Sequence, residues 1–160
     1  MPMTPAEFWD ERSDINPTLT PELRAQAEKI LGVKLPESLV KVLEYQNGGY
    51  SKGFGYPMTQ KTSWAEDHVP FDNLAGVVTD PNIRTAFNLL ESESLSTEWN
   101  LPKKQILLTG NGHWWITLNY RAGDEPSVWW MDTEIEEFLP VAPTFDVFYS
   151  GLCPNAEFGL

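Results

Sequence analysis

Residues 31–49 read LGVKLPESLVKVLEYQNGG, and they contain the strongest structural signals in the chain. Gly32 ends a helical run that starts at Thr20 and Pro21. Threonine caps a helix, proline suits its first position, and glycine allows the left-handed turn that closes it. The quoted stretch therefore begins at the end of a helix expected over residues 20–31.

The second half of the stretch predicts another helix, which Pro36 opens. Asn47, Gly48 and Gly49 end this helix, since asparagine and glycine tolerate the left-handed conformation that a helix end requires. A phosphate-binding loop would place its glycines before a helix, with a lysine and a serine or threonine nearby. The order of the residues therefore favours a helix end.

Three segments in the last third of the chain predict an antiparallel meander. Residues 105–109, 113–120 and 127–133 are rich in aromatic and β-branched side chains and are separated by turn sequences. Another helix is expected to open at Asp80 and Pro81. Together these elements predict an α+β fold, in which helices pack on one face of an antiparallel β-sheet.

The length of 160 residues suits a single domain that spans residues 1–160. Residues 1–19 are irregular and contain several prolines. We expect this segment to form an N-terminal strap, held onto the body by Phe8, Trp9 and Ile15.

The formal net charge of −12 indicates which partners the protein can have. Such a surface repels nucleic acids and anionic membranes and attracts basic proteins, although solubility alone would also explain it. The N-terminus lacks the basic and apolar regions of a signal peptide, and no apolar run has the length of a membrane span. With a single cysteine, Cys153, the chain is expected to be cytoplasmic.

No sequence motif favours an enzyme. The two histidines, His68 and His113, have no second histidine or cysteine at metal-ligand spacing. Carboxylates cluster in residues 132–137, but an acid–base pair would need environments that separate their pKa values, so a solvated acidic rim is the simpler interpretation. We expect no catalytic residue, metal or cofactor, and a ligand site near Asp67 and His68 is only a third hypothesis.

Adjacent tryptophans occur on two of the predicted strands. Because side chains alternate across a strand, Trp115 and Trp129 face away from the side occupied by Trp114 and Trp130. That second face is either an exposed interaction surface or is covered by another part of the chain.

Nine residues are therefore candidates for binding a protein partner. Exposed aromatic side chains anchor protein interfaces, and carboxylates steer a basic partner. The candidates are Tyr50, Phe54, Tyr56, Trp115, Trp129, Asp132, Glu134, Glu136 and Glu137.

Residues 20–152 resemble the SMI1/KNR4 domains of the SUKH superfamily in the order and spacing of their motifs. The opening stretch is similar to the family's Leu-Gly, Leu-Pro, helix and closing Asn-Gly-Gly, which fall here on Gly32, Pro36, Asn47, Gly48 and Gly49. LPKKQILLTGNGHWWITLNYRAGDEPSVWWMDTE resembles the family's glycine turn, strand and return strand, and VAPTFDVFYSGL its closing helix.

This resemblance implies an α+β domain without known catalysis. Bacterial members are similar to immunity proteins, which bind and block polymorphic toxins, often nucleases, whereas fungal members are similar to regulators of cell-wall synthesis and signalling. The expected function is a non-catalytic module that binds a cognate toxin and occludes it. The alternative is a regulatory or scaffold module that binds a cellular protein.

Overall fold

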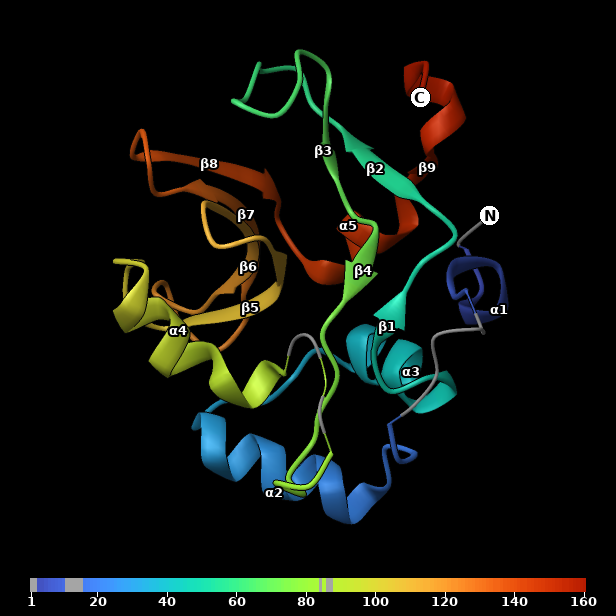
Figure 1. The fold of residues 1–160 in the computed structure, drawn as a ribbon, viewed down its shortest axis with the longest axis vertical. Helices are drawn as coiled ribbons and strands as arrows, with labels where there is room; N and C mark the ends of the chain where they lie inside the picture. The colour runs from blue at the N-terminus through green and yellow to red at the C-terminus, as the bar shows by residue number, and fades with distance from the viewer. Residues whose placement is uncertain (1–2, 11–15, 84, 86–87) are drawn as a thin grey trace.

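The computed structural model describes residues 3–10, 16–83, 85 and 88–160 of the chain. Helices come first along the chain, and two runs of strands follow with helical segments between them, as Figure 1 shows. The helical segments are α1 (Pro5–Phe8), α2 (Pro21–Leu31), α3 (Glu37–Tyr45), η2 (Leu89–Glu91), α4 (Ser92–Glu98), α5 (Phe145–Ser150) and η3 (Asn155–Phe158). The strands are β1 (Gly49–Tyr50), β2 (Phe54–Pro57), β3 (His68–Pro70), β4 (Asn73–Leu74), β5 (Gln105–Gly110), β6 (Trp114–Asn119), β7 (Ser127–Asp132), β8 (Glu137–Ala142) and β9 (Cys153–Pro154).

The largest sheet is a four-stranded antiparallel meander in the order β5-β6-β7-β8. The antiparallel meander expected from the sequence is therefore confirmed, with β8 as an additional strand. Because consecutive strands reverse direction, the β5–β6 turn (residues 111–113) and the β7–β8 turn (residues 133–136) lie at the same end of the sheet. Two smaller sheets, β1-β4 and β3-β2-β9, are built from the middle of the chain and its C-terminal segment.

The two faces of the meander are covered differently. One face joins the main hydrophobic core, where Ile116 and Trp130 are fully buried together with residues of α3 and α5. The other face carries a second, smaller cluster, in which Trp115 packs with Leu101 and with Leu95 of α4. The α+β class is confirmed, but helices pack on both faces of the sheet and not on one, as Figure 1 shows for α4 beside β5.

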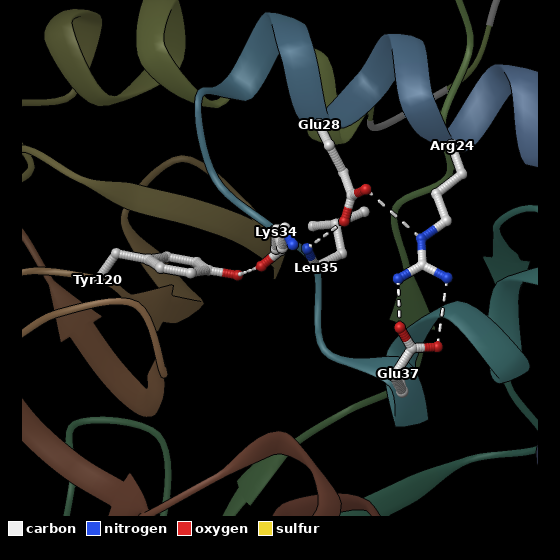
Figure 2. A network of polar contacts seen from close by, with 6 residues as sticks. All are labelled: Arg24, Glu28, Lys34, Leu35, Glu37 and Tyr120. Carbon is white, nitrogen blue, oxygen red and sulfur yellow. Dashed lines mark hydrogen bonds and ion pairs between the residues drawn. The ribbon is translucent and has the colours of Figure 1, made fainter.

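The link between α2 and α3 is fixed by polar contacts that Figure 2 shows. Gly32 ends α2 in the left-handed conformation, with φ 73°. The Glu28 carboxylate then accepts a 2.8 Å hydrogen bond from the backbone N–H of Leu35, and the Tyr120 hydroxyl donates to the Lys34 carbonyl oxygen at 2.6 Å. The link is thus held from α2 on one side and from the end of β6 on the other.

Arg24 connects the two helices directly. Its guanidinium forms a bidentate pair with Glu37 at the start of α3 and contacts Glu28 at 3.6 Å, as drawn in Figure 2. The hydrogen bond and negative charge of Glu37 raise the pKa of Arg24, and the same pair lowers the pKa of Glu37. Both groups are therefore charged at neutral pH.

Asn47 does more than mark a helix end. α3 ends at Tyr45, and the positive φ angles expected after it occur at Gly48 (94°) and Gly49 (132°). The buried Asn47 side chain donates to the carbonyl oxygens of Pro17 and Val77 and accepts from the Val77 N–H, each at 2.8 Å. This one side chain therefore joins the N-terminal segment and the segment after β4 to the end of α3.

Two of the predicted anchors of the N-terminal strap lie in the core, and the segment, expected to be irregular, contains the short helix α1. Phe8 and Trp9 are both 0% exposed, and the Trp9 indole donates to the Val42 carbonyl oxygen at 2.9 Å. Ile15, the third predicted anchor, lies outside the described residues. The prediction of a helix that opens at Pro81 is wrong, because residues 81–82 form a turn and α4 begins only at Ser92.

Candidate functional site

Trp115 is not a surface anchor. It is 2% exposed and lies against Leu101, Leu107 and Met131 under α4. The strand alternation placed it on the correct face, but α4 covers that part of the face, so the expected exposure is wrong. Trp129 lies on the same face farther from α4 and is partly exposed, with its indole N–H donating to the Ser127 hydroxyl at 2.8 Å.

The three predicted aromatic anchors of residues 50–56 are also separated by the fold. Phe54 is 8% exposed and stacks on Phe8, so it belongs to the core. Tyr56 is half-buried and stacks on Phe148, with the ring centroids 5.1 Å apart. Tyr50, on β1, is 58% exposed. These residues therefore do not form one binding loop.

Two of the four predicted acidic residues have structural roles. Asp132 is 6% exposed, accepts a hydrogen bond from the Ser63 hydroxyl and accepts another from the Glu134 N–H at 3.0 Å. One Glu137 carboxylate oxygen accepts from the Trp130 indole N–H and the Ser63 backbone N–H, both at 2.9 Å. The expected solvated acidic rim is wrong for Asp132, which is buried, whereas Glu137 is half-buried; both hold the loop around Ser63 onto the sheet.

The hairpin end of the meander instead gathers exposed side chains from four segments. We call this surface the hairpin rim, formed by residues 63–66, Trp99, 111–113 and 133–136. Its largest exposed apolar side chains are Trp64 (46%), Trp99 (36%) and Ile135 (59%). Glu134 and Glu136, which the sequence predicted as partner contacts, are exposed on the same turn. The rim thus combines part of the predicted acidic cluster with two tryptophans that were not predicted.

Trp64 is positioned by a series of ring contacts that reaches the core. Its ring centroid lies 5.5 Å from that of Trp114, which in turn stacks on the buried Trp130 at 5.2 Å. Ser63, the preceding residue, is bonded to Asp132 and Glu137. Trp64 is therefore fixed at its base while its outer surface faces solvent.

Trp99 is held at the other side of the rim. Its ring lies over Gly112, where an added Cβ would come within 3.1 Å of the indole, and its centroid is 6.2 Å from that of the His113 ring. His113 Nδ1 is 3.4 Å from a Glu134 carboxylate oxygen. The Thr133 N–H also donates to the His113 carbonyl oxygen at 2.8 Å, so the two turns are joined to each other.

Protein side chains pack closely around His68, where the sequence suggested a possible ligand site near Asp67. His68 is 4% exposed, stacks on Phe158 with centroids 4.2 Å apart, and places Nδ1 2.8 Å from the Asp67 carboxylate. An open groove of about 470 Å³ lies elsewhere, between α1, α3 and α5, where Lys41 and Tyr149 line it. Within the described ranges, no group of three or more His, Cys, Asp or Glu side chains could hold a metal ion.

The single thiol is poorly suited to nucleophilic chemistry. Partial burial and the charge of Glu157 raise the pKa of Cys153, so it remains protonated at neutral pH. Its Sγ contacts the Gly151 carbonyl oxygen at 3.5 Å. A reactive cysteine needs the opposite environment, one that stabilises the thiolate.

The two tryptophans of the rim had a weak signal in the sequence. Trp64 occurs in the loop sequence KTSWAED, and Trp99 follows the polar run ESESLSTE. A tryptophan in a polar segment without helical or strand periodicity has no predicted core to enter, which is a reason to expect exposure. Only the fold brings the two segments to the same end of the sheet.

Comparison with known proteins identifies the family of this chain. The sequence model of the SMI1 / KNR4 family (SUKH-1) matches residues 18–151, which is most of the chain. A comparison with curated proteins found no match. Among the described residues, no helix has the length and apolar character needed to cross a membrane.

Proposed function

The chain belongs to the SMI1/KNR4 (SUKH-1) family, and from this we propose that it is a non-catalytic protein-binding module that acts as an immunity protein. In this proposal it binds a cognate bacterial toxin in the cytoplasm and neutralises it by occluding the toxin's active site. The observation that carries the proposal is the family match over residues 18–151, since the family is known for immunity proteins and is generally non-catalytic.

The charge of the protein supports a basic partner. A net charge of −12 gives the surface a negative potential, which accelerates association with a basic protein and opposes binding to nucleic acids. Nuclease toxins need basic surfaces to bind their substrates. An acidic protein that covers such a surface would block access of the nucleic acid.

The first experiment is a pull-down from the source organism with the tagged protein as bait. The captured partner is then expressed in a test host with and without this protein, and cell survival is measured. We expect the partner to be toxic alone and harmless when both are present, with a one-to-one complex in solution. A partner that is bound but not toxic would contradict the immunity function and favour the regulatory or scaffold alternative.

A further inference from the structure

We propose that the hairpin rim is the surface that contacts the partner, and that it takes a cationic segment whose arginine or lysine side chains lie over Trp64 and Trp99. This inference rests on the proposed protein-binding function and assigns it a surface. It also replaces Trp115, which is buried, with tryptophans that a partner can reach.

The exposed apolar side chains of the protein are not spread evenly. Trp64, Trp99 and Ile135 are 46%, 36% and 59% exposed and belong to three segments that meet at one end of the meander. The other large exposed apolar side chains in the described part of the chain lie on separate elements: Ile30, Tyr45, Tyr50, Val147 and Leu160. Clustered exposed aromatic side chains are typical of the centre of a protein interface.

Contacts within the protein itself hold the segments of the rim in place. Trp64 packs on Trp114, and the loop that carries it is bonded to the sheet through Ser63. The Thr133–His113 backbone hydrogen bond joins the two turns. Because binding does not have to order these segments, less of the interaction free energy is lost to conformational entropy.

The chemistry of the rim selects for cations. Glu66, Glu134 and Glu136 are exposed on the segments that carry Trp64 and Ile135. A guanidinium or ammonium group is attracted both by the face of an indole ring and by neighbouring carboxylates. Arginine suits such a site best, because its planar group can stack on tryptophan while it bonds a carboxylate.

A defined peptide probe tests this assignment without knowledge of the partner. An alternating Arg-Gly octapeptide is titrated into the ¹⁵N-labelled protein, and the indole and backbone N–H resonances are followed by NMR. The matched Glu-Gly peptide is the charge control. We expect the largest shifts at the Trp64 and Trp99 indoles and no saturable shift with the acidic peptide. Shifts spread over all acidic surfaces, or centred on Tyr50, would overturn the proposal.

Paired variants then locate the binding energy. Trp64→Ala and Trp99→Ala should each weaken the peptide about tenfold, as expected for an interface anchor. Tyr50→Ala, an exposed aromatic residue on β1, is the matched control and should change the affinity less than about twofold. Circular dichroism confirms that each variant is folded. Equal losses for the rim variants and the control would refute the assignment.

The same variants separate this inference from the proposed function. If a toxin is captured by the wild-type protein and also by the double variant Trp64→Ala, Trp99→Ala, the immunity function stands and the rim is the wrong surface. If the captured protein is not a toxin but is lost in the double variant, the rim is correct and the immunity function is wrong. Loss of a captured toxin in this variant alone supports both.

Discussion

Replacement of Asn47 by alanine tests whether this side chain connects three segments of the chain. Asn47 is 2% exposed, and both of its bonds to Val77 are buried, whereas its bond to the Pro17 carbonyl oxygen is partly buried. Alanine removes all three hydrogen bonds and leaves the Val77 N–H without its acceptor. The change also leaves the backbone of α3 intact, since Asn47 lies after the end of that helix.

The expected loss of unfolding free energy is about 3 kcal/mol. A typical hydrogen bond contributes roughly 0.5–1.5 kcal/mol, and a buried donor left without a partner costs about 1–3 kcal/mol. For a chain of this size, a loss of about 1 kcal/mol lowers the melting temperature by roughly 2–4 °C. The variant should therefore melt about 6–12 °C below the wild-type protein.

Urea unfolding monitored by tryptophan fluorescence measures this loss. Asn82→Ala, at an exposed turn, is the matched control and should change the unfolding free energy by less than about 0.5 kcal/mol. Asn47→Asp is a second test, because it keeps the acceptor for Val77 and loses both donors. A loss below about 1 kcal/mol in Asn47→Ala would refute the role assigned here, since water would then replace these bonds.

Three further predictions concern the core. Trp115→Ala should lower the unfolding free energy by about 3–5 kcal/mol in urea unfolding, as for a buried aromatic residue, and a stable variant would refute its burial. Gly76→Ala should cost about 1–3 kcal/mol in the same assay, because the new methyl group would overlap the Asn47 carbonyl oxygen. Burial, and next the charge of Glu28, raise the pKa of Tyr120 above the value of about 10 in an unfolded chain. The contribution of the neutral hydroxyl to stability is therefore complete below pH ~10 and is lost at higher pH. Tyr120→Phe should reduce this alkaline loss of stability in thermal melts. The same dependence of melting temperature on pH in both proteins would contradict the prediction.

Local signals in the sequence were sufficient for helices α2 and α3 and for strands β5, β6 and β7. Thr20, Pro21 and Gly32 bound a helix because capping depends on residues close in the sequence, and α2 spans Pro21–Leu31. The paired tryptophans of β6 and β7 were assigned to the correct faces because strand alternation is equally local. The helix expected from Pro81 was wrong, since proline at a first helical position is also common in turns.

The candidate site was predicted less well than the fold. The acidic residues Glu134 and Glu136 are exposed as expected, whereas Asp132 and Glu137 are engaged by the loop around Ser63. Nothing near these residues in the sequence indicates that contact, because Ser63 and Asp132 are 69 positions apart. The exposure of a side chain depends on which distant segment packs on it.

The sequence by itself determined the α+β class, the meander and the acidic charge of this protein, because capping, strand alternation and charge are local or additive properties. The order and spacing of its motifs also determined the resemblance to the family. Only the tertiary structure decided that Trp115 is buried beside α4 and that Trp64 and Trp99 both lie at the hairpin end of the sheet. The physical reason is that burial is a property of long-range packing. Two residues with the same strand pattern, such as Trp115 and Trp129, differ in exposure because Trp115 lies inside the cluster beside α4 and Trp129 lies at its margin.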